Sequence, residues 1–424
     1  MKLNYKRTIL IGLAFMSICT FWQVYDNVIP LILKFTFQVG DTTSGVIMAL
    51  DNVLALFLLP LFGTLSDRSN SRLGKRMPFI LCGTALSVVF MLLLPVADRA
   101  VNLVFFITAL LLTLISMGTY RSPAVALMPE LTPKPLRSSA NAIINLMGAL
   151  GGILALGFIK ILVGKGDRPD YFPLFIAVAV VMVICVVILY LTVPERKLAE
   201  ALGDQDDDEE EADKAAPVGK LPRDVFKSLI LILCAVALWF MGYNAISSAF
   251  SKYTKVYLGM EGTGYADCLL IGTVAAILTY VPAGMVASKI GRRKTILIGI
   301  GMIIVAFSIA SFIKEYSLFL VALFVVTGMG WATINVNSYP MVVEMSKGSD
   351  IGKYTGYYYT FSMAAQVITP ILSGFLLEHV GYQTLFPYSL AFMVLAFIVM
   401  LFVRHGDAKV EARRGLEAFE DMDD

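Results

Sequence analysis

The sequence predicts an all-α membrane protein with twelve transmembrane helices arranged as two pseudo-symmetric halves of six. Three observations predict this fold class. Hydrophobic residues make up 58% of the 424-residue chain and charged residues 16%, against a usual charged share of about a quarter. Twelve apolar segments are long enough to cross a bilayer, which takes roughly 20 residues per helix. Weakly similar motifs also recur in the two halves of the chain.

Each predicted span is an apolar run between polar or charged segments. We expect helices because a chain in lipid must satisfy its own backbone hydrogen bonds, and the short alternating strands typical of a barrel do not appear. The first span is too long for a signal-peptide core and no small-residue cleavage site follows it, so we expect it to be retained. In order, the spans are 8–33, 43–66, 77–95, 102–128, 138–163, 172–193, 224–250, 263–288, 293–313, 317–341, 352–377 and 383–403.

Lysine and arginine are distributed unevenly between the segments that join the spans. With the N-terminus in the cytoplasm, 25 of them fall on the cytoplasmic side and eight on the other side, while Arg121 lies inside a span. Positively charged residues concentrate in cytoplasmic loops. We therefore predict a multi-pass protein of the plasma membrane whose two termini are both cytoplasmic.

The longest connection divides the spans into six and six. It carries the acidic run 204–211, DQDDDEEE, followed by Ala, Pro and Gly. This composition is typical of a solvated, flexible linker, and a regulatory or partner-binding role is the alternative. We predict an N-terminal six-helix bundle at 1–193, an acidic cytoplasmic linker at 194–223, a C-terminal six-helix bundle at 224–404 and a cytoplasmic tail at 405–424.

The two halves share short motifs at offsets near 217 residues. The segment 63–76, GTLSDRSNSRLGKR, follows the second span, and the similar segment 284–293, GMVASKIGRR, follows the eighth. Trp22 matches Trp239 at an offset of 217. Two six-helix halves related by an axis along the membrane normal are the plan of one large class of transporters, which bind their substrate where the repeats meet.

The loop after the second span carries a family resemblance. Gly63, Asp67 and Arg68, with 74–76, GKR, in the same loop, resemble the signature loop of the major facilitator superfamily. The loop is lengthened by 69–73 and followed by Pro78, which resembles sucrose–proton symporters and the related solute carrier 45-type and glycoside–pentoside–hexuronide carriers. The superfamily resemblance covers all twelve spans, whereas the subfamily resemblance rests mostly on residues 51–152.

That resemblance implies coupled sugar transport, with an arginine late in the fourth span that binds substrate. Arg121, within 120–130, YRSPAVALMPE, matches that arginine. Sodium-coupled melibiose-type carriers have two aspartates just before the second-span proline, where this sequence has Ala55 and Leu59. We therefore expect coupling to protons.

Three charged side chains lie deep within spans: Asp26, Asp51 and Arg121. Each costs about 2.5–3.5 kcal/mol at mid-bilayer on insertion scales, so such residues usually have functions. Arginine stays charged and offers a planar donor fork to sugar hydroxyls or a carboxylate. A carboxyl group in a desolvated cavity can take up and release a proton. We predict Asp51 as the proton carrier and Asp26 as the second candidate, and a structural ion pair with Arg121 is the alternative.

Sugars bind to aromatic faces flanked by amide, hydroxyl and charged groups. Such residues recur one helical turn apart in the spans, as Trp22 with Asp26 and Trp331 with Asn335 do. Packing against lipid or other helices is the alternative for any single aromatic residue. The predicted substrate-binding residues are Arg121, Trp22, Asn141, Asn145, Tyr243, Asn244, Trp331, Asn335 and Tyr358.

Charged residues at the cytoplasmic ends of the spans are candidate gating residues. In the resembled family, such loops form charge contacts that hold one conformation of the two halves. Plain topology determinants are the alternative reading. The predicted gating residues are Asp67, Arg68, Arg76, Glu130, Arg137 and Glu344.

Several function classes are excluded by what the sequence lacks. It has no nucleophile elbow, phosphate-binding loop or zinc-binding pair, two histidines and five scattered cysteines, so we expect no catalysis, cofactor, metal or disulfide framework. The net charge of +2 argues against nucleic acid as a partner. We predict a monomeric secondary transporter that moves a glycoside, such as a disaccharide, with a proton across the lipid bilayer. The alternatives are an exporter of drugs or non-sugar metabolites and, less favoured, a non-transporting sensor or scaffold.

Overall fold

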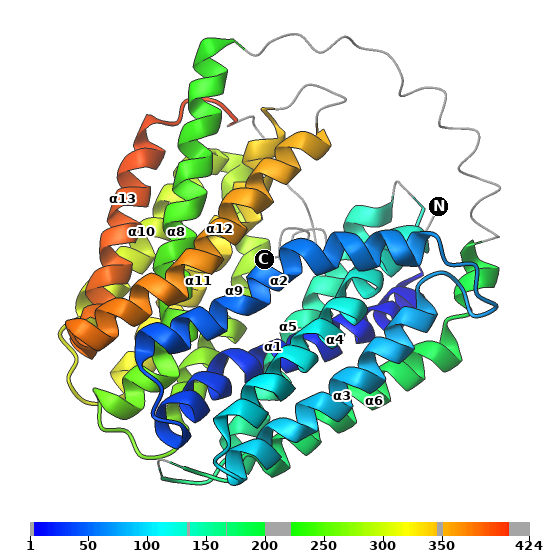
Figure 1. The fold of residues 1–424 in the computed structure, drawn as a ribbon. Coiled ribbons are helices and arrows are strands. Elements are labelled where there is room, and N and C mark those ends of the chain that lie inside the picture. The colour runs from blue at the N-terminus through cyan, green and yellow to red at the C-terminus, as the bar shows by residue number, and fades with distance from the viewer. Residues whose placement is uncertain (1–3, 134–135, 167, 200–221, 346–350, 407–424) are drawn as a thin grey trace. The chain divides into compact units, whose positions relative to one another are not determined.

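The computed structural model describes residues 4–133, 136–166, 168–199, 222–345 and 351–406. Within these residues the regular secondary structure is helical throughout, apart from one isolated bridge between Ser71 and Gly74. Twelve helical segments among them are long and apolar enough to cross a membrane. The predicted fold class is therefore confirmed (Figure 1).

The helices follow one another with short connections. They are α1 (Tyr5–Leu31), extended by the π-helical turn η1 (Ile32–Thr36), α2 (Asp41–Asp67), α3 (Met77–Arg99), α4 (Leu103–Glu130), α5 (Arg137–Leu162), α6 (Phe172–Thr192), α8 (Arg223–Val256), α9 (Gly264–Ile290), α10 (Arg292–Ala310), α11 (Leu318–Val343), α12 (Ile351–His379), the 3-10 turn η4 (Tyr382–Thr384) and α13 (Leu385–Phe402).

Most predicted ends agree with the structure to within a few residues. The largest difference is at the end of α8, which was predicted to stop at 250 and continues to Val256. The added turn contains Lys252 and Lys255, whose charges end the apolar run. The helix nevertheless continues because Lys252 is buried, with 4% of its surface exposed, and paired with Asp41.

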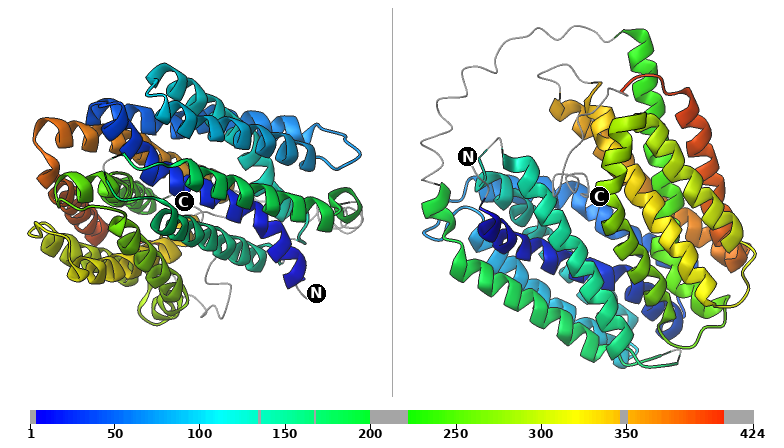
Figure 2. Two further views of the ribbon diagram at one scale, coloured as in Figure 1. Left: turned by 90° about the horizontal axis from the view of Figure 1, so that it is seen from below. Right: turned by 180° about the vertical axis from the view of Figure 1, so that it is seen from behind.

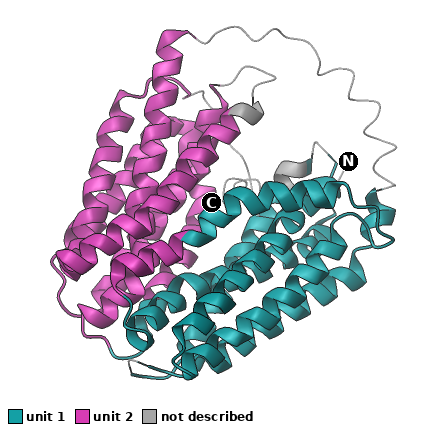
Figure 3. Cartoon of the chain, in the orientation of Figure 1, with its two compact units in different colours: residues 1–39, 50–210, 261–266 teal, residues 40–49, 211–260, 267–424 magenta. Residues whose placement is uncertain are grey.

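The chain forms two compact units (Figure 3). Unit 1 comprises residues 1–39, 50–210 and 261–266. Within it α1 packs along α5 and α3 along α4 (Figure 2). Glycines permit these contacts, since a Cβ on Gly151 would overlap the carbonyl oxygen of Met16 and one on Gly83 would press on Tyr120. Thr20 Oγ1 also donates to the carbonyl oxygen of Gly151 at 3.2 Å.

Unit 2 comprises residues 40–49, 211–260 and 267–424. Within it α10 packs along α11 and α8 packs along both α12 and α13. Close helix contacts again occur at glycines, where Gly299 meets Gly330 and Gly272 meets Gly328. The division passes through α2, whose first residues, to Ala49, belong to unit 2 and whose remainder belongs to unit 1.

Candidate functional site

Unit 1 brings together the three charged residues that the sequence places within spans. Asp26 on α1 interacts electrostatically with Asp51 on α2, and Asp51 interacts with Arg121 on α4. All three side chains are half-buried. Within the described part of the chain, Arg121 forms no salt bridge to either carboxylate, so the predicted alternative of a structural ion pair is not what the geometry shows.

Aromatic rings border these charges. The guanidinium carbon of Arg121 lies 5.6 Å from the ring centre of Trp22, within range of a cation–π contact. Trp22 in turn meets Tyr25 edge to face, with ring centres 5.3 Å apart. Because Trp22 and Asp26 lie one turn apart on α1, the same face of that helix offers an aromatic surface beside a carboxylate.

The two carboxylates have different surroundings. Asp51 Oδ1 accepts a hydrogen bond of 2.9 Å from Asn52 Nδ2, in addition to the nearby charge of Arg121. Among the described residues, Asp26 has no hydrogen-bond partner for its carboxyl group. The adjacent Asn27 donates instead to the carbonyl oxygen of Gln23 at 2.9 Å. Asp51 is therefore the better stabilised as an anion.

The predicted amides of α5 also belong to unit 1. Asn145 is buried, with 3% of its surface exposed, and Asn141 is half-buried one turn earlier. Their helix packs against α1, which carries Trp22 and Asp26. Both amides take part in contacts with other residues.

Unit 2 contains an aromatic stack. The rings of Tyr243 on α8 and Trp331 on α11 lie parallel, with centres 3.7 Å apart and an angle of 4° between their planes. Phe240, also on α8, meets Trp331 edge to face at 5.3 Å. The stack holds both rings rigidly, which is the arrangement that sugar-binding aromatic faces need.

Two amides beside this stack lack partners among the described residues. Neither Asn244 Nδ2 nor Asn335 Oδ1 has a hydrogen-bond partner there. Asn244 follows Tyr243 in the chain, and Asn335 lies one turn after Trp331 on α11. Unsatisfied buried polar atoms are costly, so a donor and an acceptor left open in this way point to a ligand or to ordered water.

Tyr358 has a different environment. It is buried, with 2% of its surface exposed, and its hydroxyl shares a hydrogen bond of 2.9 Å with Ser338 Oγ on α11. Its ring also meets that of Tyr339. Tyr358 thus links α12 to α11, and its hydroxyl already has a partner.

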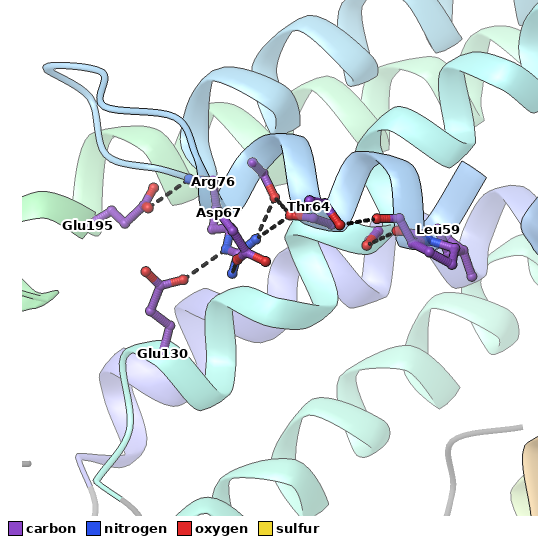
Figure 4. A network of polar contacts seen from close by, with 10 residues as sticks. Leu59, Thr64, Asp67, Arg76, Glu130 and Glu195 are labelled. Atoms are coloured by element: carbon purple, nitrogen blue, oxygen red, sulfur yellow. Dashed lines mark hydrogen bonds and ion pairs between the residues drawn. The ribbon is translucent and has the colours of Figure 1, made fainter. Parts of the chain in front are cut away.

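Most of the predicted gating residues of unit 1 meet at Arg76 (Figure 4). Arg76 Nε donates to Glu130 Oε2 at 2.8 Å, and its terminal nitrogens contact Asp67 and Ser66. The loop after α2 is thereby tied to the end of α4. Arg68 is exposed and takes no part in this network, and the side chain of Arg137 lies outside the described residues.

Glu195 is a member of this network that the sequence did not reveal. Its carboxylate accepts from the backbone N–H groups of Arg76 and Met77, at 2.8 and 2.7 Å, and so caps the start of α3. Burial, with 1% of the residue exposed, raises the pKa of Glu195, and these hydrogen bonds partly offset the effect. A carboxylate directly after Pro194 at the end of the sixth span was the available signal.

Unit 2 has a corresponding contact. Arg292, the first residue of α10, pairs with Glu344 after α11 at 2.6 Å. Arg293 instead donates to the carbonyl oxygens of Met400 and Leu401 at the end of α13. The repeat predicted from sequence therefore extends to a pair of arginine–glutamate contacts, one in each unit.

Metal binding has no candidate in the described part of the chain, where no group of three or more His, Cys, Asp or Glu side chains could hold an ion. The charged residues described above are instead paired with one another or exposed to potential substrates. Their chemistry is that of binding and proton exchange.

Comparison with known proteins agrees with the geometry of the fold. The Major Facilitator Superfamily family model matches residues 11–279 and 268–419. The chain is 28% identical over 121 residues to the MFS-type transporter ppzB of Metarhizium rileyi, covering 28% of this chain and 25% of that protein. It is 27% identical over 200 residues to the uncharacterized protein YqgE of Bacillus subtilis, covering 44% of each. The chain thus spans less than half the length of these curated relatives.

Solved structures resemble the whole fold more completely. A crystal structure of the nucleoside transporter NupG aligns with a TM-score of 0.71 and 14% identity, covering 94% of this chain and 100% of that one. A bacterial homologue of the iron transporter ferroportin, in an inward-facing state, aligns with a TM-score of 0.69 and 14% identity, covering 94% and 99%. At such low identity these likenesses show the fold and nothing about the substrate.

Proposed function

The chain belongs to the major facilitator superfamily, and from that premise we propose that it is a secondary transporter that moves a glycoside together with a proton. The observation that carries the proposal is the cluster of Asp26, Asp51, Arg121 and Trp22 in unit 1. Within a membrane-spanning bundle, charges are expensive and are retained for binding or for ion movement. Two carboxylates and one guanidinium leave one negative charge in the cluster, which a bound proton neutralises.

The surroundings of the two carboxylates support different roles. Asp51, which accepts from Asn52 and lies near Arg121, stays ionised and orients the guanidinium. Asp26 has neither contact among the described residues and lies close to a second negative charge, so it gains most from taking up a proton. We therefore assign the proton to Asp26 and the orienting role to Asp51, which reverses the order expected from the sequence.

Arg121 is assigned to the substrate. Its guanidinium lies against Trp22 and forms no salt bridge among the described residues, so its donors remain available to hydroxyl or carboxylate oxygens. A neighbouring aromatic face can carry the C–H surface of a sugar ring. Arg121 and Trp22 thus offer the two kinds of contact that a glycoside requires.

Unit 2 offers a second set of such contacts. The stacked Tyr243 and Trp331 supply an aromatic platform. The open donor of Asn244 and the open acceptor of Asn335 suit hydroxyl groups, each of which donates and accepts. This combination favours a polyhydroxylated ring over an apolar drug-like molecule.

The arginine–glutamate contacts are assigned to gating. Arg76 with Glu130 and Arg292 with Glu344 tie helix ends within each unit. We propose that the loops carrying them keep their shape through these contacts during alternating access. The exposed Arg68 is then a topology determinant.

Counterflow in proteoliposomes tests the proposal. The purified protein is reconstituted with unlabelled sugar inside, and the entry of labelled sucrose, maltose, glucose or a galactoside is followed with and without sodium. We expect exchange of at least one glycoside, unaffected by sodium. Failure of every sugar to exchange would reject the glycoside assignment and direct the search to non-sugar metabolites or exported compounds.

A further inference from the structure

The first turn of α2 is held in unit 2 by buried charges far from the cluster described above. Lys252 Nζ on α8 lies 2.9 Å from Asp41 Oδ1. The hydroxyl of Tyr382 in η4 lies 2.8 Å from each oxygen of the same carboxylate. Asp41 is 1% exposed and Lys252 4% exposed, so the ion pair is removed from water.

Helix α12 adds a second polar contact to the same turn. Glu378 Oε2 accepts from the backbone N–H of Thr42 at 2.7 Å. This N–H is one of the donors that the start of a helix leaves without an intrahelical partner. The carboxylate also interacts favourably with the positive end of the helix dipole.

Between these polar contacts the backbones of α2 and α12 touch. A Cβ on Gly45 would overlap the carbonyl oxygen of Pro370, and a Cβ on Gly374 would overlap that of Asp41. With glycine at the crossing, the two helices meet without side chains that interlock. They can therefore separate without prior rotamer changes.

An ion pair is an expensive way to make a permanent contact. Desolvation of the two charges offsets much of their attraction, and apolar residues of similar volume often stabilise such a site at least as well. What charges provide in addition is a contact whose separated partners are stabilised by water once the site opens. Asp41, Lys252 and Tyr382 have the composition of a contact that opens and closes.

The course of α2 indicates when this contact would open. The helix belongs to unit 2 up to Ala49 and to unit 1 from Leu50, so a movement between the units must either bend α2 or free its first turns. Residues 46–59 contain neither proline nor glycine, the usual sites of helix bending. Release of the first turns is therefore the easier response.

We propose that Asp41, Lys252, Tyr382 and Glu378 form a reversible clasp on α2, closed in this structure and released in one half of the transport cycle. The proposal rests on the proposed transport function for its cycle, but its opening can be measured without any substrate. Ser44, 1% exposed in the second turn of α2, becomes reachable when the clasp opens.

The test is maleimide labelling of a cysteine at position 44. Ser44→Cys is made in a full-length chain whose five native cysteines are replaced, and the protein is studied in lipid nanodiscs so that both faces are accessible. Ser389→Cys, at a site that is 0% exposed on α13, is the matched control for general loosening of unit 2. The quantity compared is the ratio of the two labelling rates.

We expect Asp41→Asn and the milder Tyr382→Phe each to raise this ratio about tenfold or more. A ratio that stays the same in both variants, whether both rates are low or both rise together, would overturn the clasp. Because no sugar is present, a failure of the counterflow assay leaves this result untouched. A raised ratio beside absent sugar exchange would keep the clasp and reject the glycoside.

Discussion

Arg76 Nε lies 2.8 Å from Glu130 Oε2, and this contact joins the start of α3 to the end of α4. The same kinds of residue make the corresponding contact between the start of α10 and the residue that follows α11, where Arg292 lies 2.6 Å from Glu344. In unit 1, however, the guanidinium also contacts Asp67 and Ser66. The resemblance between the halves thus includes an energetic feature, developed further in the first half.

Arg76→Lys should destabilise the protein although it preserves the charge. An ammonium group cannot reproduce the several directed contacts of the planar fork, and each lost hydrogen bond to a charged partner costs about 1.5–3 kcal/mol. We expect a clear fall in the melting temperature followed by tryptophan fluorescence. Arg68→Lys, at the exposed neighbour in the same loop, should change the stability by less than about 0.5 kcal/mol. Equal effects of the two variants would contradict the network.

Glu195→Gln should change how stability depends on pH. Burial raises the pKa of Glu195, so the folded state keeps this proton at pH values where the unfolded chain has lost it. The wild-type protein therefore loses stability from this group as pH rises from the ordinary glutamate range through the folded pKa. Relative to wild type, the variant should gain melting temperature over that interval and keep a constant offset below it. Glu261→Gln, at an exposed carboxylate, is the control, and a relative gain as pH falls would refute the account.

Arg121→Lys should abolish transport while the protein remains folded. The charge is retained, but the planar donor fork that we assign to the substrate is lost. The measurement is counterflow of the transported sugar beside the melting temperature. Arg168→Lys, at an exposed site, should behave as wild type in both assays. Normal counterflow in Arg121→Lys would remove this residue from the binding site.

Tyr243→Leu should weaken sugar binding more than Tyr243→Phe. Phenylalanine keeps the stack on Trp331, whereas leucine forfeits an aromatic contact of about 0.5–1.5 kcal/mol. A loss of about 1 kcal/mol corresponds to roughly a fivefold rise in the half-saturating sugar concentration. Equal half-saturation in the two variants would show that the stack supports the helices and does not carry the sugar.

The sequence predicts the helices well because a bilayer imposes a minimum apolar length on each of them. It predicts their ends less well where charge is buried in protein, as Lys252 shows at the end of α8. Hydropathy treats that lysine as the edge of a span. Its partner Asp41 lies 211 residues away, and no motif or spacing connects the two.

The candidate site shows the same division. Helical spacing relates Trp22 to Asp26 and Trp331 to Asn335 because each pair lies on one helix. Contacts between helices depend on how the helices pack, so neither the stack of Tyr243 on Trp331 nor the cap that Glu195 places on α3 follows from local pattern. The different surroundings of Asp26 and Asp51 likewise required the structure, since Asn52 is bonded to one of them.

Sugar accumulation driven by a proton gradient tests the central claim most directly. Proteoliposomes containing the wild-type protein or Asp26→Asn are placed in an acidic medium with labelled sugar, with and without a protonophore. The account predicts that wild type accumulates sugar above its equilibrium level, that the protonophore abolishes the accumulation, and that Asp26→Asn exchanges sugar by counterflow without accumulating it. Undiminished accumulation in Asp26→Asn, or accumulation in wild type that ignores the protonophore, would contradict proton coupling through Asp26.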